Sequence, residues 1–191
     1  MSIDSENMVS ELKELFKCAN NAFIEKNRHL FDVGVSERTL CGALMVELYE
    51  SLKQSPFNNY YVDVEYNRVG DKYKMDYKTI EGPQQKVSNV SCDLIVHNRG
   101  KNGEHDNLIA LEMKKDYRKE KDKSADKNRL RFLTYRDFCD IRRVNGRKVS
   151  KSAYGYELGV YYEIRYKGRQ IYIEYYVNGK MNDKYELNIP K

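Results

Sequence analysis

The chain has 191 residues, of which 40% are hydrophobic and 33% are charged, so it can form one domain with a substantial core beneath a charged surface. Its 34 basic and 29 acidic residues give a net charge of +5, which is compatible with a polyanionic partner but does not require one. No apolar run approaches the roughly 20 residues of a membrane-spanning helix, and the four cysteines lack the paired spacing of a structural zinc site.

Two helices are predicted in the first third of the chain. Apolar residues recur at helical spacing from Val9 to Phe23, which predicts an amphipathic helix that we expect to form an appendage over residues 5–28. Ser36 is a good N-cap for a second helix, and Glu37 falls in the first turn of that helix. One face of this second helix consists of leucines spaced four residues apart: Leu40, Leu44, Leu48 and Leu52.

The middle of the chain has the patterns of strands. Residues 60–66 alternate between two faces, and residues 90–97 and 107–114 form two further, mostly apolar strands. The connector between these last two strands is rich in Gly and Asn, which predicts a hairpin. Before that hairpin lies a polar span in which residues 73–77 indicate a weaker strand or hairpin arm.

Helical spacing returns over residues 121–141. The buried positions expected in this helix include Ala125, Leu130, Leu133 and Phe138. Residues 155–166 and 170–177 then alternate around a Lys-Gly-Arg turn and predict a second hairpin, and a last short strand is expected over residues 184–189. We therefore expect a single α/β domain over residues 1–191.

Two neighbouring predicted strands each carry a carboxylate within an apolar run. Glu112 and Lys114 share one side of their strand because side chains repeat every second residue, and across a hairpin Asp93 meets Glu112 on that face. Two carboxylates that converge in apolar surroundings repel each other unless a proton or a cation lies between them. A divalent ion such as Mg²⁺ or Mn²⁺ prefers oxygen ligands, and the carbonyl of Met113 offers a further oxygen. Lys114 could then orient or help to deprotonate a water, or neutralise charge that develops on a phosphate.

An Asp at the end of a strand, followed by an apolar strand that closes in Glu-x-Lys, resembles the PD-(D/E)XK superfamily of restriction-endonuclease-like nucleases. Cys92 stands where that family often has a proline. Similarity to small bacterial members extends to Glu37-Arg38, to residues 65–68 and to residues 126–134. The resemblance implies an αβββαβ core, with a mixed central sheet flanked by helices, to which this chain adds an N-terminal helix and a C-terminal hairpin.

The resemblance also implies hydrolysis of phosphodiester bonds with Mg²⁺ or Mn²⁺, and DNA is the expected substrate. Asp93, Glu112 and the carbonyl of Met113 would bind the metal, and Lys114 would position or activate water. An acidic residue of the first core helix is expected nearby. Glu37 is the first choice for this residue, and Glu47 is the alternative because ten residues along returns it to nearly the same face.

Basic residues cluster between Lys114 and Arg131, directly after the Glu-x-Lys motif. A charge run of this kind is usually a solvated helix face, and the acidic residues within it favour that interpretation. Its position also raises the prospect of phosphate contacts, for which Lys127 and Arg131 are the best candidates because they share a helix face. Arg68 is a further candidate for nucleic-acid binding, although a salt bridge explains it equally well.

Two other functions stay open. One is a catalytically inactive nuclease-fold module that binds nucleic acid or a protein partner. The other is a plain interaction domain, which predicts that Asp93 and Glu112 lie far apart or face solvent. The polar start of the sequence, residues 1–14, and the unpaired cysteines lead us to expect a cytoplasmic protein with no membrane partner. A homodimer stays open as well, with the helix over residues 9–23 as a candidate contact surface.

Overall fold

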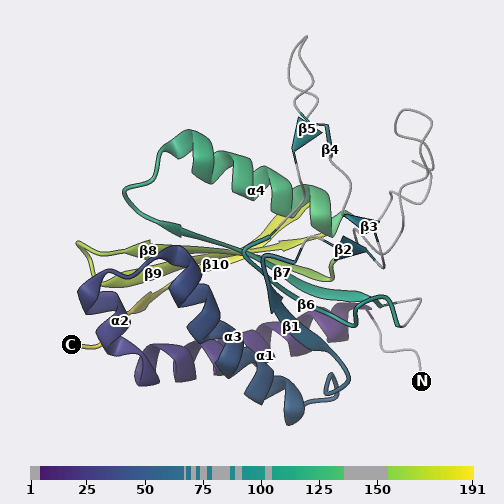
Figure 1. Cartoon of the computed structure of the whole chain (residues 1–191), viewed down its shortest axis with the longest axis horizontal. Helices are drawn as coiled ribbons and strands as arrows, with labels where there is room; N and C mark the ends of the chain where they lie inside the picture. Colours follow the sequence, from purple (N-terminus) through teal and green to yellow (C-terminus); the bar gives the residue numbers. More distant parts are fainter. Residues whose placement is uncertain are drawn as a thin grey trace.

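A six-stranded mixed sheet forms the centre of the fold, and helices cover both of its faces (Figure 1). The computed structural model describes residues 5–66, 68–69, 72–73, 77–78, 87–88, 92–101, 105–135 and 155–191. The strands of the sheet, in spatial order, are β1 (Tyr61–Val64), β6 (Leu94–His97), β7 (Asn107–Lys115), β8 (Leu158–Arg165), β9 (Gln170–Val177) and β10 (Lys180–Asn188). Strands β7 and β8 are parallel, and the other neighbours in this sheet are antiparallel.

Two short ladders lie between β1 and β6 in the sequence. Strand β2 (Arg68–Val69) pairs with β3 (Lys72–Tyr73), and β4 (Tyr77–Lys78) pairs with β5 (Val87–Ser88). These ladders occupy the span in which a weaker strand was predicted, although Met75 lies outside the described residues.

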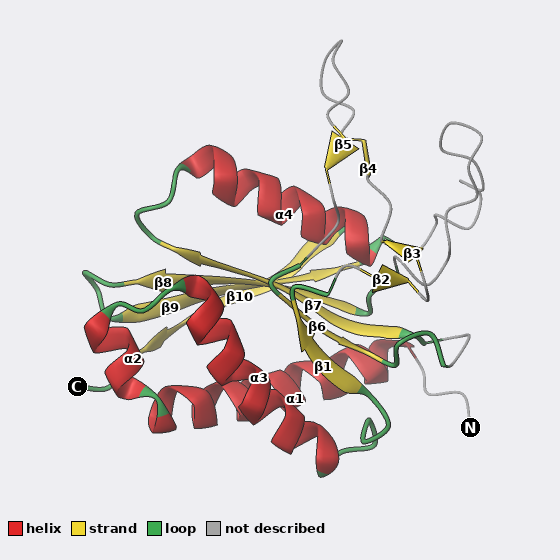
Figure 2. Ribbon diagram, viewed as in Figure 1, coloured by secondary structure: helices red, strands yellow, loops and turns green. Residues whose placement is uncertain are grey.

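Helices α1 (Ser5–Lys26), α2 (Arg28–Val33) and α3 (Glu37–Lys53) lie on one side of the sheet, and α4 (Glu120–Thr134) lies on the other (Figure 2). The larger core packs α1 and α3 against the sheet, with Leu12, Phe16 and Leu44 fully buried. The helix expected as an appendage therefore supplies part of the main core. A smaller core beneath α4 contains Leu130 and Leu133 together with residues of β6, β7, β8 and β9.

The start of α3 is fixed as the sequence predicted. Ser36 has extended backbone dihedrals, and its side chain accepts a hydrogen bond of 3.1 Å from the backbone N–H of Thr39. The chain reaches this cap through Gly34, which has φ of 65° and ends α2 in the left-handed region that glycine adopts most readily. Glu37 consequently occupies the first turn of α3, beside the end of β7.

Helix α4 differs from its prediction in two respects. It ends at Thr134 rather than at residue 141, because Tyr135 has extended dihedrals; residues 136–154, and with them Phe138, lie outside the described residues. Ala125 is exposed, so its predicted burial is wrong. The buried stripe of α4 instead runs through Lys123, Asp126 and Leu130, because charged side chains of the sheet stabilise the two charged members. None of the helices within the described ranges is both long enough and apolar enough to cross a membrane.

Candidate active site

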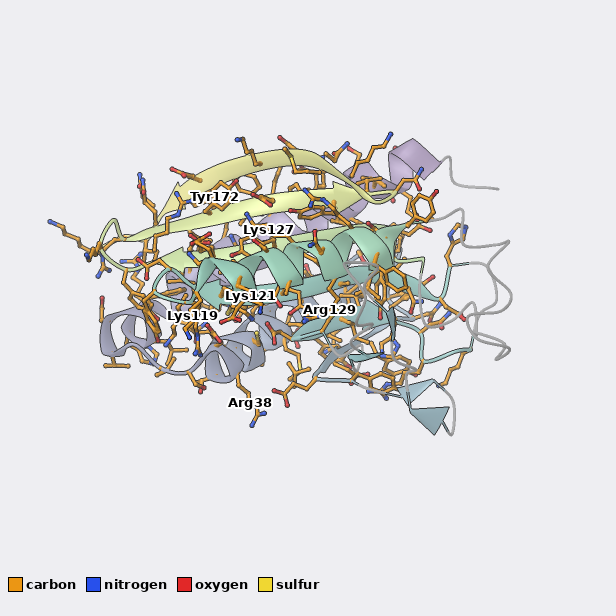
Figure 3. All side chains as sticks on the ribbon, turned by 90° about the horizontal axis from the view of Figure 1, so that it is seen from above. Arg38, Lys119, Lys121, Lys127, Arg129 and Tyr172 are labelled. Atoms are coloured by element: carbon orange, nitrogen blue, oxygen red, sulfur yellow. The ribbon has the colours of Figure 1, made fainter. Side chains whose placement is uncertain are left out.

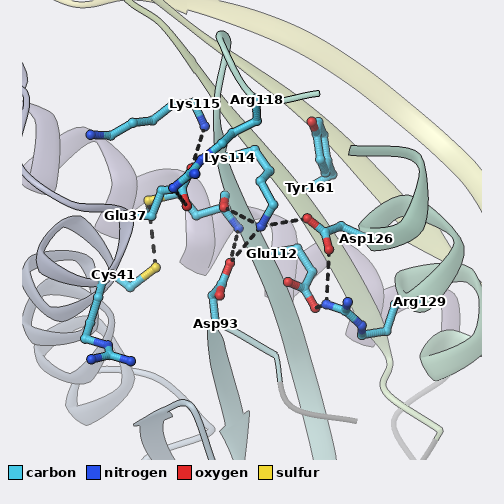
Figure 4. Close-up of polar contacts among 12 residues, drawn as sticks. Glu37, Cys41, Asp93, Glu112, Lys114, Lys115, Arg118, Asp126, Arg129 and Tyr161 are labelled. Carbon is cyan, nitrogen blue, oxygen red and sulfur yellow. Dashed lines mark hydrogen bonds and ion pairs between the residues drawn. The ribbon is translucent and has the colours of Figure 1, made fainter. Parts of the chain in front are cut away.

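Asp93 and Glu112 lie opposite each other on two neighbouring strands. The antiparallel register pairs Leu94 with Leu111, which places Asp93, the residue before β6, across from Glu112 of β7 (Figure 4). Oδ2 of Asp93 accepts a hydrogen bond of 2.8 Å from the backbone N–H of Met113. Burial raises the pKa of Asp93, and burial together with the nearby charge of Asp93 raises the pKa of Glu112.

Lys114 points into the space beside these carboxylates. Its Nζ lies 2.7 Å from Oδ2 of Asp126 and 3.8 Å from Oδ2 of Asp93, and it donates a hydrogen bond of 3.2 Å to the carbonyl oxygen of Met113 (Figure 4). Burial alone would lower the pKa of Lys114, but the carboxylates of Asp126 and Asp93 outweigh this effect and raise it. The side chain is therefore an ammonium ion among oxygen atoms at neutral pH.

Helix α4 supplies an acid and a base that face β7. Nη1 of Arg129 lies 2.5 Å from Oε1 of Glu112 and 3.2 Å from Oδ1 of Asp126. Asp126 and Arg129 are three residues apart and share a helix face, while Glu112 and Lys114 are two apart and share a strand face. The two pairs therefore meet as a buried chain of ion pairs that runs from Glu112 through Arg129 and Asp126 to Lys114.

Glu37 enters the site from the first turn of α3. Its Oε1 accepts hydrogen bonds of 3.0 Å from the backbone N–H of Lys115 and from Nε of Arg118, and its Oε2 accepts one of 3.0 Å from Nη2 of Arg118. Burial tends to raise the pKa of Glu37, but these hydrogen bonds lower it overall, so the carboxylate stays ionised. Glu37 and Asp93 both line an open cleft of about 290 Å³, whose other lining residues are Ser36, Arg38, Cys41, Val64, Glu65 and Arg118.

Glu47, the alternative to Glu37, lies elsewhere. It is buried against α1, where its Oε2 accepts a hydrogen bond of 2.7 Å from Nζ of Lys26. Its partner thus belongs to α1, and Glu47 lies ten residues further along α3 than Glu37. Of the two glutamates, Glu37 is the one that the fold brings to Asp93.

Neither Lys127 nor Arg131, two of the residues predicted to bind nucleic acid, lines the cleft. Lys127 donates a hydrogen bond of 2.8 Å to Oε1 of Glu174, and its Nζ lies 5.6 Å from the ring centroid of Tyr172, beside which it appears in Figure 3. Arg131 is exposed and lies over the ring of Tyr176, 5.4 Å from its centroid. Arg68 is part of β2, but its side chain lies outside the described residues.

Three residues of the site were not predicted: Arg118, Asp126 and Arg129. All three belong to the charged run that the sequence indicates as a solvated helix face. Besides the similarity noted over residues 126–134, spacing was a signal, because Asp126 and Arg129 fall on one face of α4 together with Leu130 and Leu133.

Carboxylate and carbonyl oxygens, such as those at the centre of the site, are ligands that a hard divalent cation prefers. In this structure, however, they already contact cationic side chains. The Asp93 carboxylate and the Met113 carbonyl already lie close to a cation, the Lys114 ammonium. No group of three or more His, Cys, Asp and Glu side chains within the described residues is arranged to hold a metal ion. A metal could therefore use these oxygens only if Lys114, and Arg129 at Glu112, changed their contacts.

The chain matches no family model, and comparisons with curated proteins and with solved structures find no significant match. Its function is accordingly inferred from the arrangement of the site.

Proposed function

We propose that this protein is a metal-dependent nuclease that hydrolyses phosphodiester bonds, with DNA as its substrate. The observation that carries the proposal is the convergence of Asp93, Glu112 and Lys114 where the start of β6 lies beside the end of β7. Glu112 is buried and lies opposite Asp93, whereas a plain interaction domain would separate these carboxylates or expose them. A buried carboxylate next to a second acid is costly for stability, which is typical of functional sites.

The topology supports the same proposal. The elements α3, β1, β6, β7, α4 and β8 follow one another as helix, three antiparallel strands, helix and a strand parallel to β7. This order is compatible with the αβββαβ core expected from the resemblance to restriction-endonuclease-like nucleases, with the short β2–β5 ladders inserted after β1. In that core the acidic residue of the first helix lies near the metal, which is the position of Glu37 relative to Asp93.

Each residue then has a distinct part in the proposed reaction. Asp93, Glu112, the Met113 carbonyl and Glu37 would hold Mg²⁺ or Mn²⁺, which would supply Lewis-acid stabilisation of the phosphate and favour ionisation of the attacking water. The Lys114 ammonium would orient that water or neutralise charge that develops on the phosphate. Arg118 fixes Glu37 through two hydrogen bonds and would keep its carboxylate aimed at the cleft.

The proposal is tested by incubating labelled single- and double-stranded DNA, and RNA, with the protein and Mg²⁺, Mn²⁺ or EDTA. We expect metal-dependent cleavage that falls by at least about 100-fold in Asp93→Asn, Glu112→Gln and Lys114→Met. Glu186→Gln and Lys184→Met are matched controls, because both side chains are exposed on β10. Cleavage that survives the three site substitutions would show that the active site has been misplaced.

A second candidate function is a nuclease-fold module that binds nucleic acid or protein without cleaving. The observation that favours it is the internal compensation of the site, since Arg129 pairs with Glu112 and Lys114 pairs with Asp126. This candidate predicts that wild type cuts none of the substrates with either metal, and that Asp93→Asn binds nucleic acid as tightly as wild type does.

A further inference from the structure

The Lys114 ammonium lies beside two of the oxygen atoms that the proposed metal would use. Among the three oxygens around Nζ, two belong to groups proposed as metal ligands: the Asp93 carboxylate at 3.8 Å and the Met113 carbonyl at 3.2 Å. The third, Oδ2 of Asp126, is the nearest at 2.7 Å and belongs to no proposed ligand. A divalent ion on the first two oxygens would lie within a few ångströms of the ammonium, where like charges repel strongly in a poorly solvated site.

Asp126 is built to hold a cation. Its side chain is 6% exposed, so water screens its charge poorly. Its second oxygen is fixed by Arg129 at 3.2 Å, and Arg129 is in turn fixed by Glu112. The carboxylate can therefore keep the ammonium at its own end of the site while the oxygens of Asp93 and Met113 are used by another cation.

We propose that Lys114 is a built-in competitor of the metal ion, and that Asp126 is a positioning residue which holds the ammonium away from Asp93 and Met113. This inference rests on the proposed metal dependence and deepens it. The metal affinity of the protein would then depend on whether the Lys114 ammonium stays with Asp126 or moves to the oxygens of Asp93 and Met113. We also expect the two members of the Lys114–Asp126 pair to change metal affinity in opposite directions.

The direction of each change in metal affinity follows from the charge of the side chain that is replaced. Lys114→Met removes the competing ammonium and keeps an apolar stem of similar length, so the metal should bind more tightly. Asp126→Asn keeps the shape of the side chain but removes its charge, so the ammonium shifts toward Asp93 and the metal should bind more weakly. With Lys114 already replaced, Asp126→Asn should have little further effect, because the residue through which it acts is absent.

The test is calorimetric titration of the full chain with MnCl₂ and with MgCl₂, in the absence of nucleic acid. We expect the apparent Kd to fall by about tenfold or more in Lys114→Met and to rise by about threefold to tenfold in Asp126→Asn, as is usual for coupled sites. Lys114→Arg, which keeps the charge, should not bind more tightly than wild type. Lys121→Met and Asp122→Asn are matched controls, because they make the same charge changes at exposed positions of α4.

The outcomes separate this inference from the proposed function. An unchanged Kd in Lys114→Met would overturn the competition and leave the metal site standing. Equal weakening by Asp126→Asn in the wild-type and Lys114→Met backgrounds would show that Asp126 acts on the metal directly, which overturns its holding role. Absence of binding in both wild type and Lys114→Met would overturn the metal dependence itself. Circular dichroism of each variant establishes whether it is folded. If Asp126→Asn is unfolded, the titration of Lys114→Met alone decides whether Lys114 competes with the metal.

Discussion

Arg129 neutralises a glutamate that is shielded from solvent: its Nη1 lies 2.5 Å from Oε1 of Glu112, whose side chain is 1% exposed. The two residues come from different elements, α4 and β7, so their ion pair joins the helix to the sheet. Removing one partner of a buried pair is costlier than forming the pair is favourable, because the remaining charge keeps its desolvation penalty.

Arg129→Met should therefore lower the free energy of unfolding by about 3–5 kcal/mol near pH 8. Burial already raises the pKa of Glu112, and loss of the guanidinium raises it further. When the pKa of a carboxyl is higher in the folded state than its ordinary value of 4.5, the free energy of unfolding falls as pH rises from the ordinary pKa to the folded-state pKa. The loss caused by Arg129→Met should then shrink at pH 5, where Glu112 can bind a proton.

Urea unfolding of wild type and variant at pH 5 and pH 8 checks this prediction. Arg131→Met is the matched control, because Arg131 is an exposed arginine two residues along the same helix and should change stability by less than about 0.5 kcal/mol. A loss of equal size at both pH values would mean that Glu112 does not respond to the missing charge.

Replacing Glu37 should lower the cleavage rate, whereas replacing Glu47 should not. Glu37→Gln alters a carboxylate that lines the cleft with Asp93, and we expect metal-dependent cleavage to fall by at least about tenfold to 100-fold. Glu47→Gln breaks an ion pair with Lys26 of α1 and should leave the cleavage rate within about threefold of wild type, with a modest loss of stability. Rates at saturating Mg²⁺ and melting temperatures of both variants test the pair. The reverse ranking would mean that the wrong glutamate has been assigned.

Local patterns were sufficient where a single element decides the position of a residue. The cap at Ser36 needs only its own hydroxyl and the N–H of Thr39, and the shared side of Glu112 and Lys114 follows from the two-residue period of a strand. The opposition of Asp93 and Glu112 needed one further assumption, a hairpin, which the Gly/Asn-rich connector made reasonable.

Prediction failed where a charged residue depends on a distant partner. Lys123 and Asp126 are buried on α4, yet both are charged and most of the residues around them in the sequence are polar, so the helix shows little apolar periodicity. Their burial is favourable only because Glu163 of β8 and Lys114 of β7 face them, and this is a property of the packed sheet. The same reasoning explains Ala125, an apolar residue that the charged stripe leaves on the exposed side of the helix.

Glu174 should govern part of the acid stability of the protein. Its carboxylate accepts hydrogen bonds from Lys127 at 2.8 Å, from Tyr172 at 2.6 Å and from Tyr176. Burial would raise its pKa, but these donors lower it below the ordinary value of 4.5. A carboxyl with a lowered folded-state pKa adds stability that is present above the ordinary value and is lost as pH falls through the folded value.

Glu174→Gln should thus reduce the free energy of unfolding by about 2–3 kcal/mol at pH 7, since hydrogen bonds to a charged group are lost. The difference from wild type should shrink steadily below pH 4.5, and urea unfolding across pH 3 to 7 measures it. The control is Glu186→Gln, whose exposed pair with Arg165 should contribute no more than about 1 kcal/mol. A difference that is constant with pH would show that Glu174 stabilises the fold by packing and not by charge.

Gly159 sets how closely α4 approaches the sheet. A Cβ at this position of β8 would lie 3.0 Å from Cγ2 of Thr134 and 3.0 Å from Cβ of Tyr176, which is tighter than ordinary contact. Gly159→Ala should therefore displace the C-terminal turn of α4 and lower the free energy of unfolding by about 1–3 kcal/mol. Since α4 also carries Asp126 and Arg129, the rate of metal-dependent cleavage should fall in parallel.

Gly42→Ala is the opposing control for this prediction. A Cβ on Gly42, in the middle of α3, would meet no atom within 4 Å among the described residues, and alanine favours a helix over glycine by about 0.8–1 kcal/mol. This variant should be slightly more stable than wild type, with cleavage unchanged. Chemical denaturation and cleavage assays on the two variants decide the matter: if Gly159→Ala proves as stable and as active as Gly42→Ala, the approach of α4 does not depend on the missing side chain.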